Sequence, residues 1–173
     1  MLSRDLLTDG FDRIAQEVHH VLDGASSAVL EHRPDAASNT VAWLVWHLTR
    51  IQDDHVAAVA GTEQRWTASD WAGRFALPFA LGATGYGQSA EDVSAVRVGA
   101  DLLRGYFDEV HAATLAYLER ITDDDLDTVV DASWDPPVTL GVRLVSVLSD
   151  DLQHVGQAAY VRGLAVRAGA ELE

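Results

Sequence analysis

Proline occurs at only four positions in this chain of 173 residues, and its placement limits what the chain can fold into. Pro34, Pro78 and the pair Pro136 and Pro137 divide the chain into long segments that contain no proline. Because proline breaks the interior of a helix, long helices have to lie between these points. Apolar residues recur at intervals of three and four within the segments, which is typical of one face of an α-helix. The sequence therefore predicts an all-α fold.

The apolar spacing predicts four long helices, over residues 7–22, 40–60, 89–121 and 139–164. Residues 62–88 are rich in aromatic side chains, and we expect this long connection to pack over one end of the helices. Four long helices with one long crossover are typical of a four-helix bundle. We expect a single domain over residues 1–170, and we interpret residues 171–173 as an appended tail.

Composition excludes several classes of protein. The chain has no cysteine, so it has no disulfide, no thiolate zinc site and no cysteine nucleophile. Its formal net charge of −15 argues against binding DNA or RNA, because such binding depends on neutralising phosphates. The first dozen residues are charged and lack the apolar core of a signal peptide, and no uncharged stretch is long enough to span a membrane. We expect a soluble cytoplasmic protein.

Polar residues on apolar helix faces are the informative ones. His47 lies on the apolar face of the second predicted helix, and Asp150 and His154 lie four residues apart in the last one. A spacing of four places two side chains on one face, about 5–6 Å apart at Cβ, which suits a divalent metal ion. Asp151 at a spacing of three is the alternative carboxylate, and spacing alone does not separate the two. A hydrogen-bonded Asp–His pair without metal is the plainer interpretation.

Three segments carry a resemblance to a known family. They are residues 39–48 (NTVAWLVWHL), Tyr86-Gly87, and residues 150–160 (DDLQHVGQAAY). With these motifs the chain resembles the DinB superfamily of DinB- and YfiT-like proteins from about residue 5 to residue 165, and it is most similar to the actinobacterial branch that includes mycothiol S-transferases.

The resemblance implies a four-helix bundle that holds a divalent metal, usually zinc or nickel, through His47, Asp150 and His154. The family spacing favours Asp150 over Asp151, although many relatives carry histidine, and some glutamate, at that position. The resemblance also implies that mycothiol is the co-substrate, with the metal activating its thiol for attack on a small electrophile. Gln157 and Trp43 are candidates for the lining of the substrate pocket.

Other functions stay open at this point. A mycothiol-dependent isomerase would use the same metal site. A metal-dependent hydrolase would need a general base, for which only Asp151 and Asp54 are at hand. A non-catalytic stress protein that binds a metal or ligand belongs to a different class. We expect a monomer or a homodimer, with Trp66, Trp71 and Phe79 as candidate interface residues.

Overall fold

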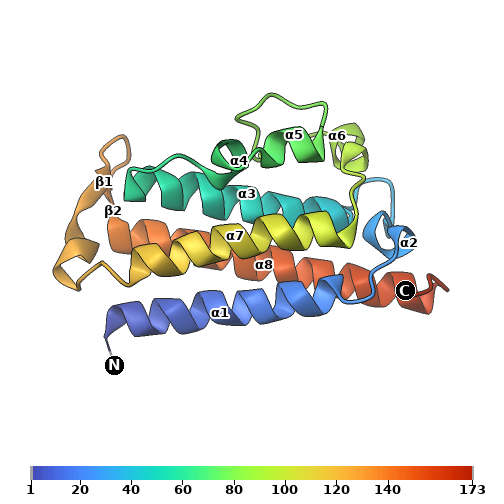
Figure 1. The fold of residues 1–173 in the computed structure, drawn as a ribbon, viewed down its shortest axis with the longest axis horizontal. Coiled ribbons are helices and arrows are strands. Elements are labelled where there is room, and N and C mark those ends of the chain that lie inside the picture. Colours follow the sequence, from blue (N-terminus) through green and yellow to red (C-terminus); the bar gives the residue numbers. More distant parts are fainter. Residues whose placement is uncertain (1, 173) are drawn as a thin grey trace.

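The computed structural model of the chain describes residues 2–172 and shows a bundle of four long helices (Figure 1). The long helices are α1 (Ser3–Leu22), α3 (Val41–Ala60), α7 (Ala100–Leu118) and α8 (Leu140–Arg167). The short elements are α2 (Ser27–Leu30), α4 (Arg65–Ala68), α5 (Trp71–Phe75), α6 (Ala90–Ala95), the 3-10 helix η1 (Asp124–Asp127), β1 (Val129–Asp131) and β2 (Val138–Thr139). The predicted all-α four-helix bundle is confirmed. No helix of the described residues is long and apolar enough to cross a membrane.

The helices that carry the predicted metal ligands begin and end at capping residues. The side chain of Thr40 accepts a hydrogen bond from the backbone N–H of Trp43 at the start of α3. Gly61 ends the same helix in the left-handed conformation, with φ of 65°, which glycine adopts without strain. Thr139 caps α8 in the way that Thr40 caps α3. These ends match the predicted ones within a few residues.

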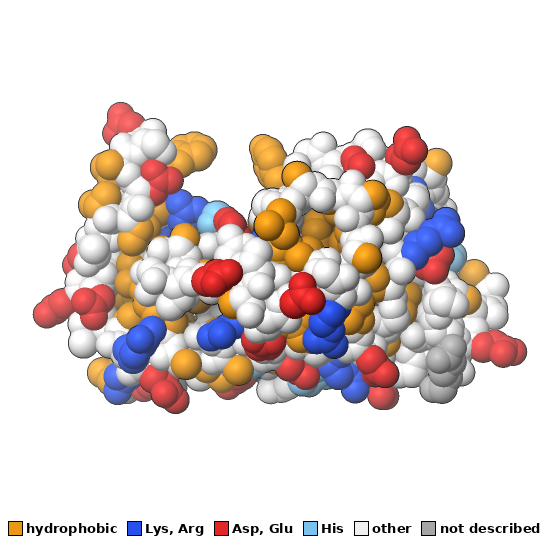
Figure 2. All heavy atoms as spheres, turned by 45° about the horizontal axis from the view of Figure 1, so that its top comes forward, with side chains coloured by type: hydrophobic (Ala, Val, Ile, Leu, Met, Phe, Trp, Pro, Cys, Tyr) orange, Lys and Arg blue, Asp and Glu red, His pale blue; other side chains and the backbone are white. Residues whose placement is uncertain are grey.

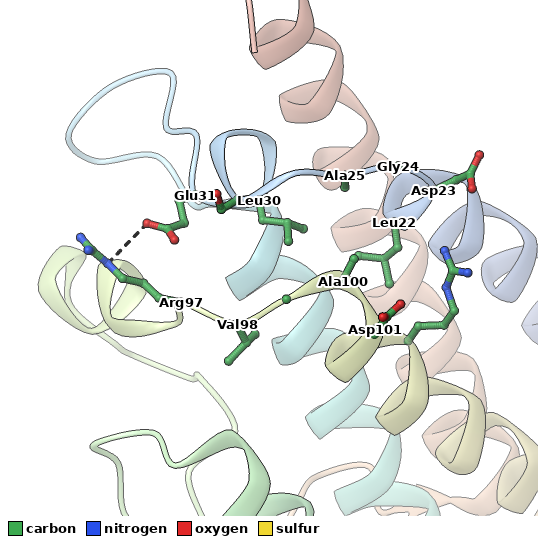
Figure 3. A pocket seen from close by; sticks show the side chains of 13 residues that line it. Leu22, Asp23, Gly24, Ala25, Leu30, Glu31, Arg97, Val98, Ala100 and Asp101 are labelled. Carbon is green, nitrogen blue, oxygen red and sulfur yellow. Dashed lines mark ion pairs between the residues drawn. The ribbon is translucent and has the colours of Figure 1, made fainter. Parts of the chain in front are cut away.

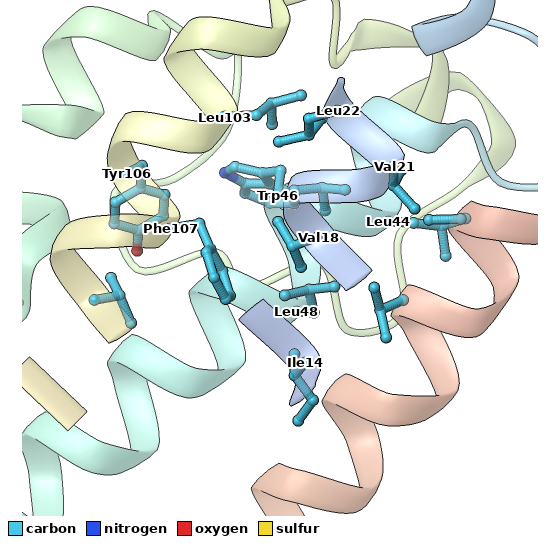
Figure 4. Packing of buried hydrophobic residues seen from close by; sticks show 14 of the residues in the cluster. Ile14, Val18, Val21, Leu22, Leu44, Trp46, Leu48, Leu103, Tyr106 and Phe107 are labelled. Carbon is cyan, nitrogen blue, oxygen red and sulfur yellow. The ribbon is translucent and has the colours of Figure 1, made fainter. Parts of the chain in front are cut away.

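The core lies along the axis of the bundle, where all four long helices contribute side chains (Figure 4). Ile14 and Val18 of α1, Trp46 and Leu48 of α3 and Phe107 of α7 are almost fully buried. Burying a side chain of this size contributes about 1.5–3 kcal/mol. The apolar faces that the sequence indicates are thus the faces that pack together, and they fix the positions of α3 and α8.

The predicted helix over residues 89–121 is wrong in one respect, because it is broken. The chain forms α6, leaves the helical conformation at residues 96–99, and resumes as α7. Val96 is buried in the core at the break, and Gly99 forms the N-cap of α7. Because valine and glycine are weak helix formers, an interruption of the helix costs little free energy here. Burial of the Val96 side chain outweighs that cost.

The aromatic crossover packs along the side of the bundle rather than over one end (Figure 1). Trp66, Trp71 and Phe75 surround Tyr106 of α7, with ring centroids 5.2–5.7 Å apart. The two tryptophans are buried within the chain, so they are not exposed for the dimer interface that we considered for them. Phe79 packs partly buried against the same core.

A buried polar network fastens the crossover to α3. Arg50 is fully buried, and its guanidinium donates to the hydroxyl oxygen of Tyr106 and to the carbonyl oxygen of Ala83. The hydroxyl of Tyr106 donates to Asp53, whose carboxylate also accepts two backbone N–H groups from the start of α4. Because Ala83 precedes the loop that covers the metal ligands, this network helps to position that loop.

Two further features were not predicted. β1 and β2 form a small antiparallel hairpin directly before α8. At the other end of the chain Leu172 pairs with Ala25, and the hydroxyl of Ser26 donates to the carbonyl oxygen of Glu171. The residues that we interpret as an appended tail therefore contact the turn after α1. Met1 and Glu173 lie outside the described residues.

Candidate metal centre

His47, Asp150 and His154 meet between α3 and α8. The Oδ2 atom of Asp150 lies 4.0 Å from Nε2 of His47 and 3.8 Å from Nε2 of His154. One ligand atom from each of the three residues lies within 4.8 Å of the others. The spacing of four in α8 places Asp150 and His154 one turn apart, and α3 brings His47 to them from the neighbouring helix. The three residues could therefore hold one metal ion.

The donor set fits a divalent metal. Two imidazole nitrogens and a carboxylate oxygen are common zinc ligands, and ligand atoms around one zinc ion lie roughly 3.3–3.6 Å apart. The separations of 3.8 and 4.0 Å are close to this value. The Oδ2 atom of Asp150 is buried and has no hydrogen-bond partner among the described residues. A buried carboxylate oxygen without a partner is costly, and a bound cation would remove this cost.

His47 is held in a defined orientation by the crossover. Its Nδ1 donates a hydrogen bond to the backbone carbonyl oxygen of Thr84. Because Nδ1 carries the proton, the lone pair of the neutral ring lies on Nε2, the atom nearest Asp150. Burial, with the nearby His154, lowers the pKa of His47 and favours the neutral ring that binds metals.

Gly85 allows the loop to approach this close to the imidazole. It has φ of 103°, and a Cβ atom built there would lie 2.5 Å from Nδ1 of His47 and 3.1 Å from the ring of Trp43. No other residue type fits such a contact without movement of the loop. The sequence contains no direct sign of this role, since a glycine in a loop is common.

Asp150, rather than Asp151, faces the two histidines. Asp151 is fully buried, and neither of its carboxylate oxygens has a hydrogen-bond partner among the described residues. Burial first, and the charge of Asp150 second, raise the pKa of Asp151 well above its ordinary value. The geometry therefore gives Asp150 as the carboxylate of the group, as the family spacing indicates.

The group is open on one side. The side chains of His47, Asp150 and His154 are 8%, 35% and 19% exposed, so His47 lies deepest and α8 forms the rim. Nδ1 of His154 is buried and has no partner among the described residues, in contrast to Nδ1 of His47. Three protein ligands with solvent access on one side are typical of catalytic zinc sites, whereas structural sites are closed.

The two candidate pocket residues differ in position. Trp43 is buried, stacks on His47 with ring centroids 4.7 Å apart, and donates through Nε1 to Gln88. Its ring also lies edge-on to His154, with ring centroids 6.4 Å apart. Gln157 is exposed on α8, three residues beyond His154. Its contact with a substrate stays a prediction.

A second polar pair lies on the same two helices. Nη1 of Arg143 lies 3.4 Å from Nδ1 of His55, and Nη2 donates to Oδ2 of Asp131 over 3.2 Å. His55 is not part of the group of His47, Asp150 and His154 found among the described residues. The sequence analysis did not single out Arg143. The spacing of seven between Arg143 and Asp150, two helical turns, is the signal that could have indicated it.

A cavity of about 580 Å³ lies away from this centre, between the turn after α1 and the start of α7 (Figure 3). The ion pair of Arg97 and Glu31 lies at its edge, with 3.5 Å between nitrogen and oxygen. None of the three grouped ligands lines this cavity. The cavity and the candidate metal centre are therefore separate features of the molecule.

The comparisons with known proteins agree with the fold. A crystal structure of a conserved protein from Enterococcus faecalis is similar to this chain, with a TM-score of 0.90, 31% sequence identity, and coverage of 96% of this chain and 99% of that one. The comparison with curated proteins found no match. The family model described as the DinB superfamily matches residues 11–158, which include all three grouped ligands. The chain belongs to the DinB superfamily.

Proposed function

We propose that this protein is a divalent-metal-dependent thiol S-transferase, with mycothiol as the thiol and zinc as the metal. The observation that carries the proposal is the open group of His47, Asp150 and His154 in a chain that has no cysteine. A thiol reaction in such a chain needs a thiol from outside and a site that activates it. His47, Asp150 and His154 between α3 and α8 offer such a site.

The residues have distinct tasks in this reaction. His47 presents Nε2 because Thr84 accepts the hydrogen bond from Nδ1. Asp150 supplies one negative charge, so the group with a divalent ion carries a net charge of about +1 and attracts an anionic sulfur. Trp43 restricts rotation of the His47 ring by stacking on it. A divalent ion bound here would favour the deprotonated form of a thiol near neutral pH.

The overall transfer balances without a protein nucleophile. The thiol loses its proton to solvent on the open side of the group. Its sulfur forms a bond to an electrophilic carbon while that carbon releases its leaving group with the bonding electrons. The exposed Gln157 lies on the same side of α8, where it could donate a hydrogen bond to mycothiol or to the electrophile.

The hydrolase alternative has less support. Its two candidate bases are poorly placed, because Asp151 is fully buried and Oδ1 of Asp54 already accepts a hydrogen bond from Gln64. Neither residue belongs to the group of three. The isomerase would share every residue of the metal group, so only product analysis separates it from the transferase.

The proposal is tested by measuring how much thiol the protein consumes with monochlorobimane as the electrophile. The metal content of the protein is determined beforehand. We expect turnover with mycothiol and little with glutathione, cysteine or no thiol. Turnover should stop on chelation and return with zinc. His154→Ala should be inactive, whereas His20→Ala, which changes an exposed histidine of α1, should be fully active. Bound metal without turnover in any thiol would contradict the transferase.

A further inference from the structure

Arg143 and His55 stand beside the metal group along the same pair of helices. Arg143 precedes Asp150 by seven residues in α8, and His55 follows His47 by eight in α3. At 1.5 Å per residue these separations are about 10–12 Å, or two turns, so each pair of residues shares a helix face. The polar pair therefore lies between α3 and α8, about two helical turns from the metal group on the side of the hairpin.

The pair offers a hydrogen-bond donor that is accessible to solvent, Nε2 of His55. A guanidinium can only donate, so Nδ1 of His55 is the acceptor in its contact with Arg143, and the neutral ring carries its proton on Nε2. Burial first, and Arg143 second, lower the pKa of His55, which favours the neutral ring. Nε2 of His55 has no hydrogen-bond partner among the described residues, and the atom is not buried. It therefore contacts solvent.

The surface beside the hairpin is hollowed. Figure 2 shows a hollow between the hairpin end of the molecule and the crossover, with a basic, a histidine and an acidic side chain in a row at its floor. Asp131 of the hairpin accepts a hydrogen bond from Arg143, and Nδ1 of His55 lies 3.4 Å from Nη1 of Arg143 and 3.8 Å from Oδ2 of Asp54. Hydrophobic side chains stand on both sides of the hollow.

About two helical turns separate the pair from the metal group on both helices. Ile51 lies midway between His47 and His55 on α3 and is half-buried. On α8 Val147 is buried in the core, and the exposed Ser146 lies between Arg143 and Asp150. A molecule that reaches from the metal group to the polar pair would therefore pass these residues and end at the cationic and N–H donors of the pair.

We propose that Arg143 and His55 bind a carboxylate of the substrate whose other end reacts at the metal group. The proposal rests on the proposed function, since it assigns the substrate class of that site. The substrate is then a small organic acid, with its carboxylate separated from the reacting end by a short chain. Arginine pairs with carboxylates through two parallel N–H groups, and a protein of net charge −15 needs such a local cation to hold an anion.

Asp131 of the hairpin now occupies one N–H group of Arg143, and it competes with the substrate carboxylate. This competition separates a binding role from a structural one. If Arg143 only fastens the hairpin to α8, loss of Asp131 and loss of Arg143 should have the same effect. If Arg143 binds substrate, loss of Arg143 should weaken binding, whereas loss of the Asp131 charge should leave it unchanged or strengthen it.

The proposal is tested by titrating the Co²⁺-loaded protein with carboxylic acids. The visible absorption of the bound Co²⁺ reports the binding of each acid. Each dicarboxylate from succinate to suberate is compared with the monocarboxylate of the same chain length. We expect one dicarboxylate in the middle of the series to bind about 10-fold more tightly than its monocarboxylate. Arg143→Gln should abolish this preference, and Asp131→Asn should keep or increase it. The amide introduced by Asp131→Asn retains an oxygen that can accept the hydrogen bonds from Ser133.

The outcomes separate the two proposals. Bound Co²⁺ with no preference for a dicarboxylate, or equal weakening by Arg143→Gln and Asp131→Asn, would overturn this inference and leave the metal site intact. Failure to bind Co²⁺ at all would overturn the metal-dependent function and this inference with it. A preference that depends on Arg143 and survives Asp131→Asn would support the inference even if no thiol is consumed.

Discussion

The Nδ1 atom of His47 donates its hydrogen bond to the carbonyl oxygen of Thr84, so the crossover fixes the tautomer of the most buried of the three candidate metal ligands. The bond joins the middle of α3 to a loop 37 residues later in the chain. Outer groups of this kind affect metal affinity about 10–100-fold when they are lost. The loop is thus part of the candidate metal centre, although none of its residues belongs to the group of His47, Asp150 and His154.

Gly85→Ala should weaken metal binding about 10–100-fold, because the new methyl group would displace either the loop or the His47 ring. Competition with a chromophoric chelator measures the affinity. Gly87→Ala is the matched control. Gly87 also has a positive φ, of 71°, but a Cβ atom there meets nothing within 4 Å. Equal affinities of the two variants would show that the close approach to His47 is unimportant.

His154→Ala should remove stoichiometric metal while the helical circular dichroism spectrum stays unchanged. The side chain lies on the partly exposed rim of the bundle, so its loss creates little strain in the core. Metal analysis after dialysis against zinc measures the effect, with His20→Ala as the control. One equivalent of zinc retained in His154→Ala would be inconsistent with its place among the ligands.

Tyr106→Phe should destabilise the protein by about 1–3 kcal/mol, because Asp53 loses a hydrogen-bond donor within the buried network. Urea unfolding of the metal-free protein measures the free energy of unfolding. Tyr117→Phe, in the same helix but with a hydroxyl that takes part in no described hydrogen bond, is the control. A loss below about 0.5 kcal/mol would mean that the network does little to hold the crossover in place.

The pKa of His55 should lie below its ordinary value of 6.5 in the metal-free protein, and Arg143→Gln should raise it. Burial is the larger cause and stays in the variant, so the rise should be partial. Between the lowered value and 6.5 the unfolded chain binds more protons at this residue, so His55 reduces stability as the pH falls through that window. Proton NMR titration of the imidazole signals, assigned with His55→Gln, measures the pKa. A value that does not change in Arg143→Gln would contradict the contact.

The sequence predicts the parts of this structure that depend on local spacing. The capped helices that begin after Thr40 and Thr139, and the placement of Asp150 and His154 one turn apart, follow from helical periodicity and capping chemistry. These features need no knowledge of how helices pack against each other.

The remaining features depend on tertiary contacts that periodicity does not contain. The helix breaks at Val96 because the side chain of this residue is buried in the core. The helical spacing of apolar residues in the sequence continues through the break. The bond from His47 to Thr84 depends on the path of an irregular loop. The contact of Arg143 with His55 depends on the register of α8 against α3.

Metal content after reconstitution with zinc, compared between Asp150→Asn and Asp151→Asn, tests the metal centre most directly. The two variants make the same chemical change at adjacent positions of α8, one facing His47 and His154 and the other fully buried. We predict one equivalent of zinc in the wild-type protein and in Asp151→Asn, and a large loss in Asp150→Asn. Zinc retained in Asp150→Asn, or lost only in Asp151→Asn, would contradict the metal centre described for this protein.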